Sequence, residues 1–207
     1  MSRKSLRQDT QMRQRIAQQA AQYMVEHGIK DFLTAKQKAA DMFGVTDGNV
    51  MPRNVEVEQA VAEYQRIFKS DVQPQRLQTL RETAIKAMTL LAKFKPRMVG
   101  AVLRGSANEH SEVNLHVFAD SPELLGHFLD EHHIPYQQHE KRLRLNKEQY
   151  IIYPALGFIA GDVPVELVIM PLTAERQAPL SPLNGKPMQR YSLSKVQDML
   201  EDETIPD

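Results

Sequence analysis

The residues best suited to chemistry lie in one short stretch, LRGSANEHSEVNLHVFAD, at positions 103–120. Gly105-Ser106 combines a residue that lets the backbone approach a ligand closely with a hydroxyl that binds anionic oxygens. Glu112 and Asn114 are two residues apart, so on a strand both side chains share one face, where oxygen ligands hold divalent cations. The stretch predicts either a phosphate and metal site or an ordinary pair of strands joined by a turn.

A further carboxylate, Glu166, interrupts the otherwise apolar run VPVELVIM. A buried carboxylate needs a partner, because removing its charge from water is costly. Two explanations stay open. One is a salt bridge, with Arg104 or Arg97 as partner; the other is a third metal-ligating carboxylate near the stretch above.

Two other polar patterns favour surfaces over sites. Taken alone, Glu112, Asn114 and His116 predict the solvated face of a half-exposed strand. The run KRLR at 141–144 predicts the exposed face of an edge strand, where charge guards against aggregation. Its cations and Arg104 would also suit a phosphate, so this second role stays open.

The elements before residue 96 read as helices. Apolar residues recur at helical spacing, Asp31 is a candidate N-cap, and Gly28 and Gly44 are candidate stop signals. Four amphipathic helices of this size can share one core. The expected helices cover about residues 8–27, 32–43, 57–68 and 77–91.

After Arg97 the pattern changes to that of strands. The proline-bearing loop SPLNGKPMQR either packs on the surface or closes over a ligand with Lys186 and Arg190 pointing inward. This order predicts an α+β protein, with a helical N-terminal region at 1–95 and an α+β domain at 96–207. The expected strands are 98–103, 113–118, 136–145, 149–159 and 163–170, with helices at 121–132 and from Ser192.

The region 97–171 resembles the nucleotidyltransferase fold, which DNA polymerase beta and poly(A) polymerases share. In that family the first strand ends in Gly-Ser, the next strand carries Asp-x-Asp, and a later strand adds a third carboxylate. Two metal ions held there serve phosphoryl transfer. The resemblance implies a mixed β-sheet of nucleotidyltransferase type with flanking helices and a Mg²⁺ or Mn²⁺ site. It implies nucleotide contacts at Arg104, Gly105 and Ser106 and metal ligands at Glu112, Asn114 and Glu166.

This chain departs from the family pattern at the acidic pair. Glu112 is longer than Asp, and Asn114 lacks the negative charge, which weakens its grip on a hard cation. The expected function is therefore a catalytically degenerate nucleotidyltransferase-like protein that binds a nucleotide or an RNA end, with no catalytic residue assigned. The alternative is a protein-interaction or adaptor module that uses the sheet only as a scaffold.

Composition limits which partners and which cellular compartment we expect. The net formal charge is zero, which argues against a large surface for binding nucleic acid. Cysteine is absent, which fits a reducing cytoplasm. No apolar run suggests a membrane span or a secretory signal, so we expect a cytoplasmic protein. KAADMFGV suggests a DNA-reading helix-turn-helix, but Pro52 would break its second helix.

The two ends differ in charge. The first twenty residues carry an excess of arginine and lysine, and the last ten an excess of acid. Solvated, partly disordered ends are the favoured interpretation, and a basic arm that touches nucleic acid is the alternative. The whole chain also resembles an uncharacterised group of proteobacterial proteins through segments such as LTAKQKAADMFGV and APLSPLNGKPM. That resemblance implies a bacterial source but no mechanism.

Overall fold

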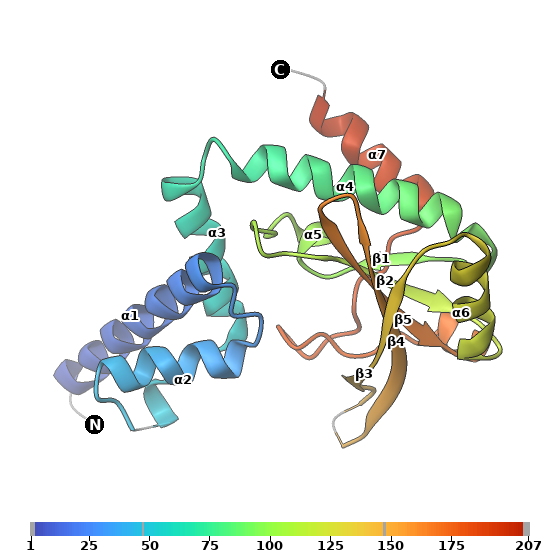
Figure 1. Cartoon of the computed structure of the whole chain (residues 1–207). Helices are drawn as coiled ribbons and strands as arrows, with labels where there is room; N and C mark the ends of the chain where they lie inside the picture. The colour runs from blue at the N-terminus through green and yellow to red at the C-terminus, as the bar shows by residue number, and fades with distance from the viewer. Residues whose placement is uncertain (1–2, 47, 147, 205–207) are drawn as a thin grey trace. The chain divides into compact units, whose positions relative to one another are not determined.

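A computed structural model of the chain describes residues 3–46, 48–146 and 148–204, with the side chains of 7–46, 48–146 and 148–201 (Figure 1). The chain forms two compact units. Unit 1 comprises residues 1–74 and 108–110, and unit 2 comprises residues 75–107 and 111–207. Each unit has its own apolar core, so the two are described separately below.

Unit 1 is a helical layer. It contains α1 (Arg3–His27), α2 (Phe32–Met42), α3 (Asn54–Phe68) and the short turn η1 (Gly48–Val50). The side chain of Asp31 caps α2 by accepting the N–H of Thr34 at 2.8 Å, as the sequence predicts. Three helices pack because each presents an apolar stripe of small and branched residues. The core includes Ile16, Ala20, Ala35, Ala39 and Val57.

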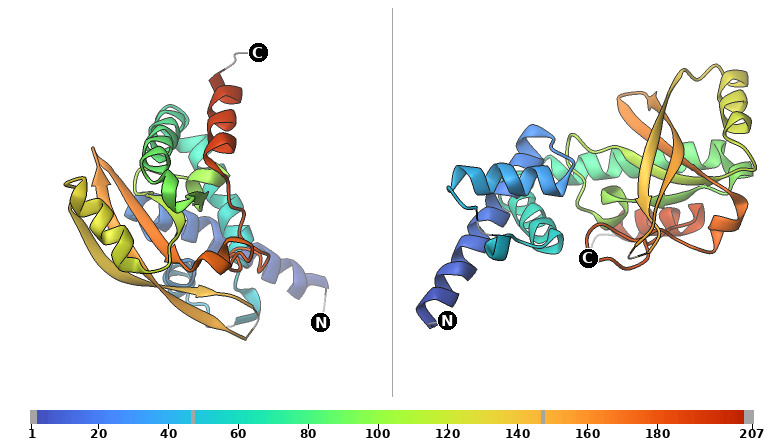
Figure 2. Two further views of the ribbon diagram at one scale, coloured as in Figure 1. Left: turned by 90° about the vertical axis from the view of Figure 1, so that its right-hand side faces the viewer. Right: turned by 90° about the horizontal axis from the view of Figure 1, so that it is seen from below.

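Unit 2 is a five-stranded mixed sheet with helices, which confirms the predicted α+β class. The strand order is β1-β2-β5-β4-β3; β2 and β5 run parallel, and the other neighbours are antiparallel. Figure 2 shows the strong twist of the β3–β4 hairpin. The strands are β1 (Arg97–Val99), β2 (Val113–Phe118), β3 (Tyr136–Arg144), β4 (Tyr150–Ala160) and β5 (Val163–Met170).

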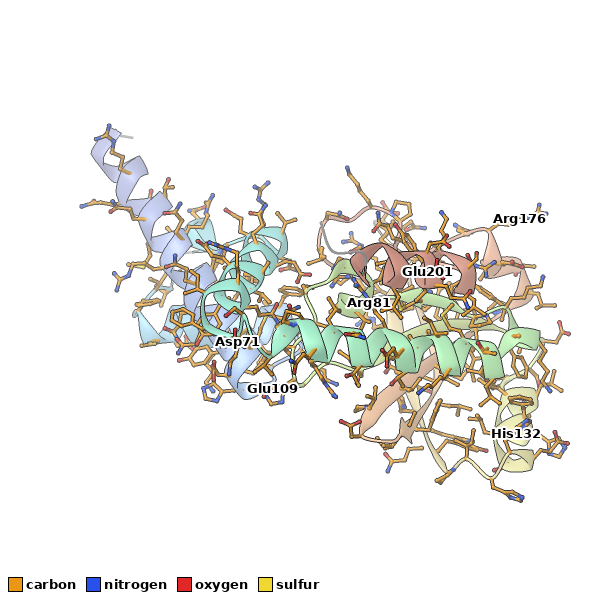
Figure 3. The ribbon with its side chains drawn as sticks, turned by 90° about the horizontal axis from the view of Figure 1, so that it is seen from above. Asp71, Arg81, Glu109, His132, Arg176 and Glu201 are labelled. Atoms are coloured by element: carbon orange, nitrogen blue, oxygen red, sulfur yellow. The ribbon has the colours of Figure 1, made fainter. Side chains whose placement is uncertain are left out.

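One face of this sheet is covered by helices. Figures 1 and 3 show α4 and α7 side by side, and both contribute to the same core as α6 and the alternate residues of the strands. Strand alternation explains this, because Leu115 and Leu167 project toward the helices while their neighbours project away. The helices are α4 (Gln73–Leu90), α5 (Ala101–Arg104), α6 (Pro122–Glu131) and α7 (Leu193–Thr204).

The opposite face is partly covered by irregular chain. The turn η3 (Leu172–Glu175) follows β5, and Ala174 packs against a small apolar cluster on this face. The next segment, residues 180–191, runs from one sheet edge to the other and is called the strap below. Its Leu180 forms a bridge to Arg144 of β3, and its Tyr191 forms a bridge to Met98 of β1.

Three sequence-based expectations change. The strand expected at 98–103 ends at Val99, because Gly100 has φ 86° and the helix α5 begins at Ala101. The fourth helix, α4, packs on the sheet and does not share a core with α1–α3. The units accordingly divide between Pro74 and Gln75, whereas the sequence placed a boundary at residue 95.

The described parts of both ends are helical, since α1 begins at Arg3 and α7 ends at Thr204. The expectation of partly disordered ends also concerns residues 1–2 and 205–207, which lie outside the described residues. The basic-arm hypothesis rests partly on Arg3 and Lys4, whose side chains lie outside the described residues. Among residues 3–46, 48–146 and 148–204, no helix combines the length and apolar character needed to cross a bilayer.

Candidate functional site

Polar side chains gather on the sheet face opposite the helices. Register sets their neighbours: Asn114 of β2 lies beside Glu166 of β5, and Arg97 of β1 lies beside His116 of β2. Because side chains two residues apart share a face, Asn114 and His116 project to the same side. We call this set, completed from β3 by His139 and Lys141, the polar face.

Glu166 has a partner, as a buried carboxylate requires. Its side chain is 10% exposed, and the Lys141 ammonium donates to Oε2 at 2.7 Å and to Oε1 at 3.0 Å. The imidazole Nε2 of His139 lies 2.9 Å from Oε1. Burial alone would raise the pKa of Glu166, but hydrogen bonds from Lys141 and His139 hold this pKa below its ordinary value.

Small residues on β4 make these contacts reachable. β4 separates β3 from β5, and at the positions between the partners it presents Ala155 and Gly157. Gly157 lies beside Glu166, and a Cβ added there would already meet the His139 ring at 3.7 Å. The side chains of His139 and Lys141 can therefore lie across β4 because no large residue stands in between.

His116 is the buried base of the polar face, at 2% exposure. Its Nδ1 lies 3.0 Å from Nε of Arg190, which comes from the strap. Arginine can only donate, so His116 accepts at Nδ1 and a neutral ring carries its proton on Nε2. Burial, with the charges of Arg190 and Lys141, lowers the pKa of His116 to about 3.

Arg190 is fixed by several acceptors. Its guanidinium donates to the carbonyl of Ala174 at 2.8 Å and lies 5.3 Å from the ring centre of Phe118. The loop sequence suits an Arg190 and a Lys186 that point inward or a loop that packs on the surface; Arg190 points inward, to His116, whereas Lys186 is exposed. The strap therefore covers His116, which corrects the expectation of a solvated strand face.

Arg97 of the polar face and the nearby Lys95 share one carboxylate, that of Glu175. Arg97 lies 3.3 Å from one oxygen of Glu175, and Lys95 lies 3.0 Å from the other. The hydrogen bond from Lys95 is the main cause of the lowered pKa of Glu175. The predicted salt bridge of Glu166 does form, but its partner is Lys141 and not Arg97 or Arg104.

The Gly105-Ser106 pair occupies a different place from the polar residues. Gly105 ends α5 at φ 77°, and a Cβ added there would meet Arg81 and Leu77 of α4, on the helix-covered side. Ser106 is buried and Arg104 is exposed. Their expected contacts with a nucleotide stay predictions.

Gly100, which the sequence analysis did not single out, is the glycine that directly follows the first strand. Its φ of 86° and ψ of −159° belong to a region that only glycine populates freely. A Cβ on it would lie 3.5 Å from Cβ of Asn114.

The residues expected to bind a metal do not form a good divalent site as they are arranged. Both oxygens of Glu166 already accept from cationic or imidazole groups, and the amide nitrogen of Asn114 donates to the carbonyl of Glu112 at 3.2 Å. Across the described part of the chain, no three His, Cys, Asp or Glu side chains are grouped to hold an ion. Mg²⁺ requires several oxygen ligands in near-octahedral geometry. Mg²⁺ or Mn²⁺ binding stays a prediction, and these donors do not favour it.

His139, Lys141 and Arg190 complete the site from segments distant in sequence. Lys141 belongs to the run that predicts a charged edge strand, and β3 is one of the two edge strands of the sheet. Only the alternation from Gln137 through His139 to Lys141 signals that these side chains share one face. Nothing in the sequence gives the β3–β4–β5 order that brings them to Glu166.

Comparison of the chain with models of known protein families, with curated proteins and with solved structures found no match. The functional assignment therefore rests on the residues of the polar face.

Proposed function

We propose that the polar face of unit 2 binds a nucleotide or an RNA end, in a nucleotidyltransferase-like protein that lacks the metal-dependent catalysis of that family. The observation that carries the proposal is the convergence of cations on one sheet face where the carboxylates are already paired. Lys141 neutralises Glu166, and Lys95 and Arg97 share Glu175. The half-buried guanidinium of Arg190 adds a further positive charge, and it donates to His116 and to the carbonyl of Ala174.

Such an arrangement suits a phosphate. Arginine offers a planar fork of donors to phosphate oxygens, and lysine offers a compact positive charge. Neutral His116 adds a polar ring that does not change charge near neutral pH. Gly100 leaves room beside Asn114 for close backbone approach. Together these features support binding without assigning a catalytic residue.

The proposal is tested by thermal shift with ATP, GTP, CTP and UTP in Mg²⁺, and by anisotropy with a short labelled RNA. A ligand present at 100 times its Kd stabilises the fold by about 2.7 kcal/mol, which is easily measured. Loss of one charge-assisted phosphate contact in Arg97→Gln should weaken binding about tenfold.

Arg176→Gln is the matched control, since Arg176 is an exposed arginine next to Glu175. It should leave affinity unchanged. No stabilisation by any nucleotide and no RNA binding by the wild-type protein would refute the proposal.

The second candidate is a protein-interaction module, and unit 1 supplies its observation. Apolar side chains are exposed where α3 ends and α4 begins: Phe68 at 65%, Val72 at 58% and Ile67 at 53%. Exposed apolar groups that are close in sequence favour contact with another protein. This candidate predicts a specific partner that co-purifies with the wild-type chain and is lost in Phe68→Asp. The partner is retained in Leu124→Asp, at an exposed leucine of α6.

A further inference from the structure

Lys141 of β3 holds the carboxylate of Glu166. Its ammonium contacts both carboxylate oxygens, at 2.7 and 3.0 Å, in a bidentate arrangement. Glu166 lies beside Asn114 in the register of β2 and β5. A metal ion bound between Asn114 and Glu166 would need the Glu166 carboxylate as a ligand. The Lys141 ammonium already occupies that carboxylate.

A divalent ion and this ammonium compete for the same lone pairs. Mg²⁺ requires oxygens about 2.0–2.1 Å away, and two cations that share one carboxylate repel each other. Displacing Lys141 would leave an ammonium without its partner, while Asn114 could offer the ion only a neutral oxygen. The resident cation is therefore favoured over the divalent one.

Lys141 keeps the capacity to bind a phosphate while it is paired. An ammonium has three N–H donors, and the two oxygens of Glu166 use at most two of them. The side chain is 39% exposed, whereas that of Glu166 is 10% exposed, so the remaining donor can face solvent. The Lys141–Glu166 pair therefore presents an N–H donor of Lys141 on the polar face, while the Glu166 carboxylate stays buried.

We propose that the Lys141 ammonium takes the place of a divalent cation beside Asn114 and Glu166, so that the polar face binds a phosphate-bearing ligand without metal. This inference rests on the function proposed above and makes it more specific. The recognised chemistry is a phosphate group on a nucleotide, with Lys141 and the nearby arginines as its counter-charges.

The first test measures ATP binding to the full wild-type chain by titration calorimetry, once in Mg²⁺ and once in EDTA. The inference predicts affinities that agree within about threefold. Binding in Mg²⁺ that falls more than tenfold in EDTA would overturn the inference and leave the proposed function standing. Absence of binding by ATP, GTP, CTP and UTP in both buffers would overturn the inference, and the proposed function would fall with it only if the short labelled RNA also failed to bind.

The second test uses Mn²⁺ alone, followed by electron paramagnetic resonance, and needs no nucleotide. The wild-type protein should leave Mn²⁺ free, and Lys141→Gln should bind it at least tenfold more tightly because Oε2 of Glu166 is released. Tight Mn²⁺ binding by the wild-type protein that Glu166→Gln abolishes would overturn the inference. So would a folded Lys141→Gln protein with no gain in affinity.

Arg142→Gln is the matched control for the neighbouring position, since Arg142 lies on the opposite sheet face and stacks on Tyr150 at 4.2 Å. It should not gain Mn²⁺. If Lys141→Gln does not fold, Lys141→Arg keeps the charge and should retain metal-independent ATP binding; a requirement for Mg²⁺ in that variant would contradict the inference.

Discussion

At the scale of single residues, His116 links the chemistry of the polar face to the stability of the fold. Its pKa of about 3 lies below the ordinary histidine value, so the unfolded chain binds this proton more tightly than the folded chain. Acid therefore favours unfolding through His116 as pH falls from about 6.5 toward 3. The stabilisation that it contributes is fully present above pH 6.5.

We predict that the free energy of unfolding falls by about 2 kcal/mol more between pH 7.5 and pH 5 in the wild-type protein than in His116→Gln. Gln is chosen because it keeps an acceptor for Arg190 and cannot titrate. Denaturant unfolding at the two pH values measures the difference. His127→Gln, at an exposed helical histidine, should behave like the wild-type protein; equal pH dependence of wild type and His116→Gln would contradict the assignment.

The Glu166–Lys141 pair should show strong coupling. A double-mutant cycle of Glu166→Gln and Lys141→Gln is expected to give a coupling energy of about 1–2 kcal/mol, measured by urea unfolding. This is less than a fully buried pair would give, because Lys141 is partly exposed. Additive effects of the two substitutions would show that the pair does not stabilise the fold.

Part of this residue-level arrangement was predictable from sequence. An acidic residue inside an apolar strand requires a partner, so the existence of a partner for Glu166 was predictable. Its identity did not follow, because Lys141 is 25 residues away in the chain and reaches Glu166 only across β4. Arg190, which orients His116, comes from a loop 74 residues away, where no periodicity operates.

At the scale of elements, the junction of β1 and α5 depends on glycine. Gly100 and Gly105 both have positive φ, but only Gly100 has the extended ψ that excludes other residues. The family pattern in the sequence directed attention to Gly105-Ser106. The structure gives Gly105 a helix-ending role in α5 and places Gly100 beside Asn114.

We predict that Gly100→Ala costs about 2–3 kcal/mol of stability, while Gly105→Asn costs less than about 1 kcal/mol because asparagine tolerates the left-handed conformation. Chemical denaturation with matched slopes measures both values. Equal costs at the two positions, or a larger cost at Gly105, would contradict the assignment of conformations.

Most elements were predictable because their periodicity is strong. The strands at 113–118 and 163–170 agree with β2 and β5, and the helices begin and end near their predicted signals. The strand expected at 98–103 failed because its apolar residues suit either a strand or a short helix, and the glycine conformation decides between them. The element against which α4 packs was not predictable, because its apolar stripe suits packing on helices and on a sheet equally well.

At the scale of the whole molecule, the two units have separate cores. Ile16 is fully buried in unit 1, so Ile16→Ala should destabilise that unit by about 2–5 kcal/mol. We predict faster hydrogen exchange in α1–α3 and unchanged exchange in β2 and β5. Exchange-mass spectrometry of the full chain measures this, and an equal loss of protection in both units would show that they unfold as one.

The central claim for the whole molecule is that ligand binding belongs to the polar face of unit 2. Its most direct test is a titration of the isotope-labelled full chain with ATP, followed by backbone amide chemical shifts. We predict that the largest changes fall at Gly100, Asn114, His116, Gly157 and Glu166. Saturating ATP that shifts none of these amides, or shifts only amides of residues 3–74, would contradict it.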